Sequence, residues 1–289
     1  MTSTRKHELP APQRLREIAE LAEFIANEYW LEGQICPLRI AKEKRISVSF
    51  NDYRDAFDGL LEHRSGRFHI YGNLRRLEHP NSPRARFTLG HELGHFFIDD
   101  HRRALETGQV RSHKSFCDYE SKNPVEREAD HFASNLLLPE GQFRKASSRG
   151  SPGLAGILDL AERFQTSVTS TAVRFTSLNI KPTAIIKWDD GVIAWKWLSG
   201  STREVGFRAT IDSSAKLASG CATARALAGE SSSSPFFSNG TTAAAWFPWI
   251  GHASVKNVLF LEEAIALGRF GVLTLLRPQG GEFDFSHPL

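Results

Sequence analysis

The sequence of 289 residues is poor in cysteine and methionine, and it has no long uninterrupted apolar run. Cys36, Cys117 and Cys221 are far apart and form no Cys-x-x-Cys pair, which argues against a disulfide framework and favours free thiols in a reducing compartment. No apolar stretch is long enough to cross a bilayer, and the first residues lack the apolar core of a secretory signal. We therefore expect a cytoplasmic enzyme or regulator without a membrane partner.

The net charge and the amino-acid composition exclude few classes of globular protein. The formal net charge of +3 is too small to indicate a nucleic-acid partner by itself. With 40% hydrophobic and 24% charged residues, the chain resembles other globular proteins, and its length allows two domains.

Hydrophobic periodicity predicts helices and strands throughout the chain. Residues 12–30 form an amphipathic helix in this prediction, with Leu15, Ile18, Ala22, Ile25 and Ala26 on its apolar side. Alternation predicts strands at 45–52 and 66–73, and helical spacing predicts helices at 153–167 and 168–179. Residues 182–197 read as strand, Asp-Asp-Gly turn and strand, which is typical of a hairpin. A Ser/Gly-rich loop at 229–240 and two apolar runs, 257–268 and 271–278, follow.

Residues 83–98 contain the pattern His91-Glu92-Leu93-Gly94-His95, or HExxH. Two histidines four residues apart lie on one face of a helix, so both imidazoles can reach one metal ion. The glutamate between them can take a proton from a water bound to that metal, and zinc lowers the pKa of such a water to about 7. The alternative is a core helix with two incidental histidines. We expect Zn²⁺, although Mn²⁺ can use the same ligands.

His101 follows His95 at the spacing where metzincin proteases keep a third histidine ligand. That class needs a glycine turn between the two histidines, and here Ile98 occupies the position. It also needs a methionine turn, and Met1 is the only methionine in the chain. We therefore interpret His101 as a solvated side chain outside the site.

The segment "EREADHFA" offers a better third ligand on a second predicted helix, which Asn123 caps and Pro124 begins. Glu126 could reach the metal, while Asp130, one turn later, could hydrogen-bond a ligand histidine from behind. Glu128 is the rival ligand, but it lies about 200° around the helix from Glu126. The alternative for Glu126 is an exposed charge that pairs with a neighbouring cation.

The segments "SPRARFTLGHELGHFF" and "EREADHFASNLLLPEGQF" resemble the ImmA/IrrE family of metallopeptidases, and the resemblance covers about residues 35 to 180. Members of this family are intracellular zinc endopeptidases that typically cut a helix-turn-helix repressor during a stress or mobile-element response. The resemblance implies that His91, His95 and Glu126 bind zinc and that Glu92 is the general base.

The fold class we expect is α+β. An N-terminal amphipathic helix (1–34) would precede a zincin-like metallopeptidase domain (35–150) and a helical subdomain (151–179). A C-terminal α+β domain (180–289) would sense a signal or hold the substrate. The helical subdomain has the cadence of a helix-turn-helix, but it offers few cations such as Arg174, so direct nucleic-acid binding is disfavoured.

Three points stay open at this stage. The strand at 66–73 could be an edge to which a peptide substrate adds, a core strand with His69 and Tyr71 exposed, or both. His113, Tyr119 and His131 are each candidates to stabilise an oxyanion. The function itself has an alternative, a non-proteolytic DNA- or protein-binding regulator with a structural or vestigial metal site.

Overall fold

The computed structural model describes residues 10–31, 33–116, 123–204, 217–247 and 258–279. The mixture of helices and sheets confirms the predicted α+β class. The chain divides into two compact units. Unit 1 comprises Met1–Phe143 and Ala161–Ser167, and unit 2 comprises Arg144–Leu160 and Val168–Leu289. None of the described helices is both long and apolar enough to span a membrane.

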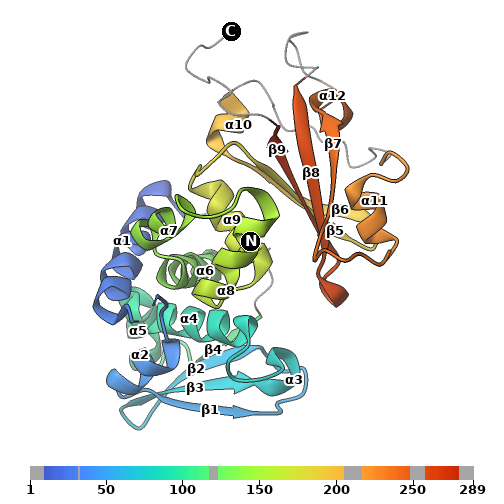
Figure 1. Ribbon diagram of the computed structural model, residues 1–289. Coiled ribbons are helices and arrows are strands. Elements are labelled where there is room, and N and C mark those ends of the chain that lie inside the picture. Colours follow the sequence, from blue (N-terminus) through green and yellow to red (C-terminus); the bar gives the residue numbers. More distant parts are fainter. Residues whose placement is uncertain (1–9, 32, 117–122, 205–216, 248–257, 280–289) are drawn as a thin grey trace, which may run out of the picture. The chain divides into compact units, whose positions relative to one another are not determined.

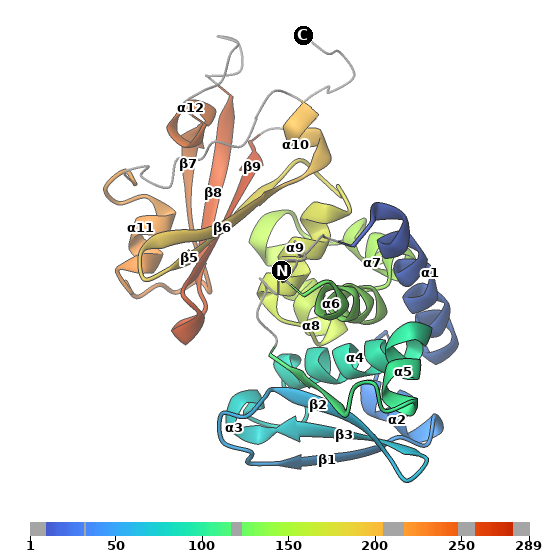
Figure 2. The same ribbon diagram turned by 180° about the vertical axis from the view of Figure 1, so that it is seen from behind.

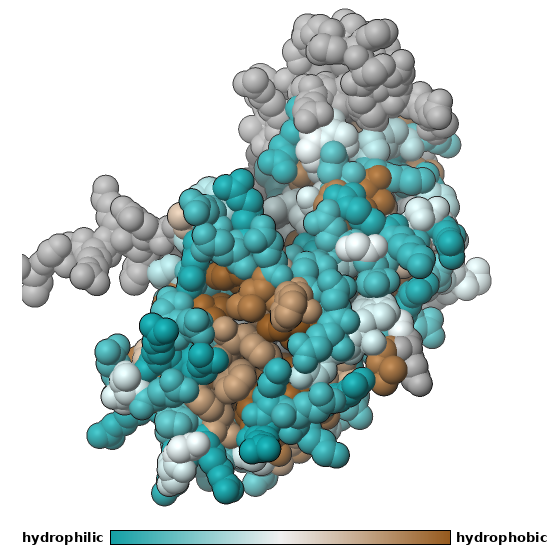
Figure 3. All heavy atoms as spheres, turned by 90° about the vertical axis from the view of Figure 1, so that its left-hand side faces the viewer, coloured by the Kyte–Doolittle hydropathy of each residue, from teal (hydrophilic) through white to brown (hydrophobic). Residues whose placement is uncertain are grey.

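Helix α1 (Pro12–Tyr29) opens unit 1 and has the two faces that its sequence predicts. Ile18, Ala22 and Ile25 are buried, and the helix packs against α6 (Pro124–Leu137). Phe24 points the other way and is 69% exposed. Figure 3 looks onto this side of the molecule and shows apolar residues gathered on it. The prediction of an amphipathic, docked N-terminal helix is confirmed.

A four-stranded sheet lies beneath the helices of unit 1, in the order β1-β3-β2-β4. Its strands are β1 (Ser47–Asn51), β2 (Gly59–Arg64), β3 (Arg67–Asn73) and β4 (Ser112–Ser115), and the short helices α2 (Pro37–Glu43) and α3 (Leu74–Leu77) accompany them. β1 is parallel to β3, and the other pairs are antiparallel. Because β3 pairs on both sides, it is a core strand, and the alternative that made it an edge is wrong. The edge next to β2 is β4.

Helix α4 (Pro83–Phe97) contains the HExxH motif and runs along one face of this sheet (Figures 1 and 2). The Ser82 hydroxyl caps it by accepting a hydrogen bond from the Ala85 N–H, and Pro83 occupies the first turn. The helix ends at Ile98, and α5 (Asp99–Glu106) begins at the next residue. The cap of α6 is as predicted, because the Asn123 side chain accepts from the Val125 N–H.

Helices α4 and α6 approach closely because small residues line their contact. Gly90 and Gly94 of α4 face Ala133 and Ala129 of α6. A Cβ atom added at Gly94 would lie 3.2 Å from the Cα atom of Ala129 and equally close to a ring carbon of Phe132. One added at Gly90 would lie 3.3 Å from the Cβ atom of Ala133. The contact therefore has no room for a larger residue on α4.

Unit 2 contains a five-stranded antiparallel sheet in the order β6-β5-β9-β8-β7. Its strands are β5 (Ala184–Asp189), β6 (Val192–Leu198), β7 (Phe237–Thr242), β8 (Leu259–Ala266) and β9 (Val272–Pro278). The helices after α6 are α7 (Glu140–Ser147), α8 (Gly153–Phe164), α9 (Val168–Ser177), α10 (Gly200–Glu204), α11 (Ala222–Leu227) and α12 (Ala243–Trp246), with the 3-10 turn η1 (Gly268–Phe270). Leu154 of α8 and Ala172 of α9 belong to a buried cluster with Ile185 and Leu273 of the sheet.

The sequence predicts the β5–β6 hairpin correctly but not the start of β7. Asp190 and Gly191 form the hairpin turn, both with positive φ. By contrast, β7 begins at Phe237, inside the segment 229–240 that we expected to be a loop. Its polar residues hide the strand pattern, since only Phe237 is buried, and pairing with β8 decides the conformation.

The α4–α6 contact yields a stability test. Gly94→Val would force the helices apart, and we expect a loss of about 1–3 kcal/mol in the free energy of unfolding. The matched control is Gly141→Val in α7, where an added Cβ atom meets nothing within 4 Å. Urea unfolding measures both variants. Equal stability of the two would contradict the packing argument.

Candidate metal centre

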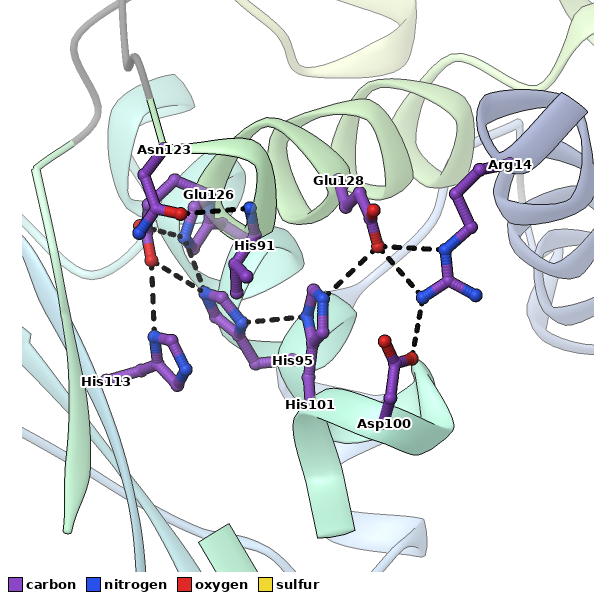
Figure 4. A network of polar contacts seen from close by, with 10 residues as sticks. Arg14, His91, His95, Asp100, His101, His113, Asn123, Glu126 and Glu128 are labelled. Carbon is purple, nitrogen blue, oxygen red and sulfur yellow. Dashed lines mark hydrogen bonds and ion pairs between the residues drawn. The ribbon is translucent and has the colours of Figure 1, made fainter. Parts of the chain in front are cut away.

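Three side chains from α4 and α6 converge with their ligand atoms around one point (Figure 4). The Nε2 atoms of His91 and His95 are 3.0 Å apart. Glu126 places its Oε2 atom 3.2 Å from the His91 Nε2 atom and its Oε1 atom 3.6 Å from the His95 Nε2 atom. Ligand atoms around a tetrahedral zinc ion are separated by about 3.3 Å, given bonds of about 2.0–2.1 Å. These residues therefore fit the metal that the sequence suggests.

Asp130 lies behind His91, on the side away from the convergence point. Its Oδ1 atom is 2.8 Å from the His91 Nδ1 atom. Burial disfavours a charged His91, but the hydrogen bonds with Asp130 and Glu126 prevail and raise the pKa of His91 to about 10. A carboxylate in this position fixes the ring orientation and leaves the Nε2 atom for a metal.

Glu92 is fully buried beside the two histidines. Among the described residues, neither of its carboxylate oxygens has a well-aligned hydrogen-bond partner. Burial raises the pKa of Glu92 to about 7, although the charge of His91 and the nearby Ser115 hydroxyl oppose the shift. Gly59 of β2 provides the necessary space, since a Cβ atom there would lie 2.5 Å from the Glu92 Oε1 atom. A buried carboxylate without a well-aligned hydrogen bond is poised to accept a proton.

The edge strand β4 brings His113 to the site. Its Nδ1 atom is 3.2 Å from the Glu126 Oε1 atom, and its ring stacks on His95 with the centroids 4.1 Å apart. Burial opposes ionisation of Glu126, but the hydrogen bonds from His113 and His91 lower its pKa to about 2. Of the three candidates for an oxyanion donor, His113 lies here, whereas Tyr119 is outside the described residues. The sequence alone did not distinguish His113, because a short polar strand carries little pattern.

The structure contradicts our prediction for His101. It is only 4% exposed, so the expectation of a solvated side chain is wrong. Its Nδ1 atom is 3.1 Å from the Nδ1 atom of His95, on the opposite side of that ring from the three converging ligand atoms. The physical reason lies at Ile98, which ends α4 with a φ of −75° and a ψ of 113°. The chain therefore turns without the positive φ that a glycine would supply.

Glu128 points away from the convergence point and toward His101. Its Oε2 atom is 3.2 Å from the His101 Nε2 atom and 2.9 Å from the guanidinium of Arg14 in α1. The hydrogen bond with Glu128, which outweighs desolvation, and a second one with Asp100 raise the pKa of Arg14. The two acidic residues that the sequence offered as rival ligands thus lie at different ends of one polar network (Figure 4).

The contact behind His91 can be tested by zinc binding. Replacing Asp130 by Asn removes the charge that orients His91, and we expect zinc affinity to fall about 10–100-fold. Competition with a chromogenic chelator measures this affinity. The matched control is Asp99→Asn, because Asp99 pairs with Arg102 at the surface. Unchanged affinity in Asp130→Asn would show that Asp130 does not orient a ligand.

Comparisons with known proteins bear on the family and the fold of the chain. No curated protein matches the chain significantly. A solved structure described as a Mycobacterium tuberculosis transcriptional regulator is similar, with 14% sequence identity and a TM-score of 0.56. The similarity covers 92% of this chain and 78% of that chain, and at this identity it shows a shared fold. Residues 62–176 match the family model of the IrrE N-terminal-like domain, a peptidase family, which confirms the resemblance to the ImmA/IrrE family.

Proposed function

We propose that this protein is a zinc-dependent endopeptidase that cleaves a protein substrate. The observation that carries the proposal is the convergence of His91, His95 and Glu126 on one point, with the buried carboxylate of Glu92 beside them. A purely structural zinc site does not need such a carboxylate and is usually closed by cysteine or histidine. The match of residues 62–176 to a peptidase family supports the same conclusion.

Glu92 acts as the general base in this mechanism. A zinc ion held by His91, His95 and Glu126 would polarise the scissile carbonyl and the attacking water. Glu92 accepts a proton from that water and then transfers it to the leaving amine. Burial raises the pKa of Glu92 above its ordinary value, which makes the carboxylate a better proton acceptor. Asp130 holds His91 in the tautomer that presents the Nε2 atom.

The substrate strand adds to β4 in this proposal. Among the described strands, β4 is the edge of the sheet next to α4, and one of its sides has no neighbouring strand. An extended peptide can pair along such an edge through main-chain hydrogen bonds. His113 of β4 contacts Glu126 through its Nδ1 atom. In this proposal its Nε2 atom would donate to the carbonyl oxygen as negative charge develops on it.

The substrate we propose is a helix-turn-helix transcriptional repressor, cut in a cytoplasmic stress or mobile-element response. This assignment rests on the resemblance to the ImmA/IrrE family, and unit 2 would sense the signal or hold the substrate. A gene for a small helix-turn-helix protein next to the gene for this protein would nominate the substrate. Incubating that repressor with the protein, with and without a chelator, then tests cleavage directly.

A second candidate function is a non-proteolytic regulator with a structural metal site. The observation that favours it is the fold shared with a protein described as a transcriptional regulator. It predicts one zinc ion per chain without turnover, together with a DNA affinity that falls steeply as salt rises. Measuring cleavage and DNA binding on the same preparation separates the two functions.

Replacing the general base gives the sharpest test of the mechanism. Glu92→Gln keeps the size of the side chain but cannot accept the proton, so we expect cleavage to fall at least 100-fold, a typical contribution of general-base catalysis. Zinc content, measured by mass spectrometry, should stay at the wild-type level because Glu92 is not a ligand. Glu43→Gln is the control, since Glu43 pairs with Arg39 at the surface. Full activity in Glu92→Gln would overturn the mechanism.

A further inference from the structure

The two histidines of the HExxH motif are held from behind in different ways. The Nδ1 atom of His91 meets a carboxylate directly, that of Asp130. The Nδ1 atom of His95 instead meets a second imidazole, that of His101, at 3.1 Å. Both rings of this pair are buried, with His95 at 0% and His101 at 4% exposure. The contact is therefore shielded from bulk solvent.

The position of the protons along this pair follows from the geometry. If the Nε2 atom of His95 is a metal ligand, its proton must sit on the Nδ1 atom. That N–H can donate only to an Nδ1 atom of His101 that carries no proton. A neutral His101 then has its own proton on the Nε2 atom, and this atom faces the carboxylate of Glu128 at 3.2 Å. This tautomer of His101 satisfies the hydrogen bond from His95, whereas the Nε2 atom of His101 and the Glu128 carboxylate form an ion-pair contact rather than an aligned hydrogen bond.

Glu128, the last residue in this series of contacts, is held by ion pairs. The Arg14 guanidinium contacts Glu128 at 2.9 Å and Asp100 at 2.6 Å. It therefore joins α1 to α6 and to the start of α5, as Figure 4 shows. Arg14 therefore holds the Glu128 carboxylate in place beside the Nε2 atom of His101.

We propose that His101 and Glu128 form a positioning relay that orients the metal ligand His95, in the way that Asp130 orients His91. The proposal rests on the metal site of the proposed function. His101 touches neither substrate nor metal and acts only through His95. Because the relay fixes the tautomer and the ring plane of His95, its loss weakens metal binding and changes the ligand geometry.

A second metal site is the rival explanation, since ligand atoms of Asp100, His101 and Glu128 also lie within 4.8 Å of one another. Two observations favour the relay. Arg14 already supplies a positive charge to both carboxylates of that group, and a cation beside a guanidinium would be repelled. The Nδ1 atom of His101 is also engaged with His95.

The test uses zinc affinity, from chelator competition, and the visible absorption spectrum of the Co²⁺-loaded full-length protein. His101→Leu removes the relay, and we expect zinc affinity to fall about 10–100-fold and the Co²⁺ bands to shift. His101→Asn keeps an oxygen acceptor near the position of the Nδ1 atom and should restore most of the affinity. Glu128→Gln should give a smaller loss with a shift of the same kind. Asp99→Asn, on the same helix as His101 but outside the relay, should match the wild type.

Each outcome bears on a different claim. Wild-type affinity and an unshifted spectrum in His101→Leu would overturn the relay while leaving the proposed function intact. Failure of the wild-type protein to bind zinc at all would overturn both. Two zinc ions per wild-type chain, one of which is lost in His101→Leu, would establish the rival second site. If His101→Leu does not fold, as judged by circular dichroism, the spectrum of Glu128→Gln decides the question.

Discussion

The close contact between α4 and α6 is the constraint on which the site depends. The HExxH helix supplies two of the proposed ligands, His91 and His95, but Glu126 and Asp130 come from α6. Side chains of this length reach the histidines only because Gly90 and Gly94 let the two backbones approach. Elsewhere in a helix a glycine costs about 1 kcal/mol relative to alanine. Here the short distance between the helices offsets that cost, because it brings a carboxylate within 3.2 Å of His91.

A glycine in the sheet of unit 1, Gly59, likewise makes room for a side chain of the site. A side chain at this position of β2 would occupy the space of the Glu92 carboxylate. The absence of a side chain at Gly59 therefore leaves room for the Glu92 carboxylate to lie buried without a well-aligned hydrogen bond. That arrangement is unfavourable for stability, since a buried acid prefers to be hydrogen-bonded or neutral. It becomes useful only when a reaction supplies a proton.

Local patterns made much of this structure predictable. Asn123 and Pro124 indicated the start of α6, and Asp190 with Gly191 indicated the hairpin turn, because caps and turns depend on a few adjacent residues. The strand β7 was missed, since its residues outside Phe237 are polar or lack a side chain and its conformation comes from pairing with β8. The location of His101 was also missed. Ile98 has extended backbone, and the chain turns there without a residue of positive φ, so the absence of a glycine does not keep His101 away from His95.

Helix α6 holds three acidic residues within five positions, and each of them has a different role at the site. Glu126 lies at the convergence point, Asp130 backs His91 and Glu128 backs His101. The packing of this one helix therefore determines whether all three acidic residues reach the site. If the site binds a metal as proposed, metal affinity and the packing of α6 are coupled, and each stabilises the other by the same free energy. A partner that shifted α6 by a fraction of a turn would disassemble the site as a whole without contacting any ligand.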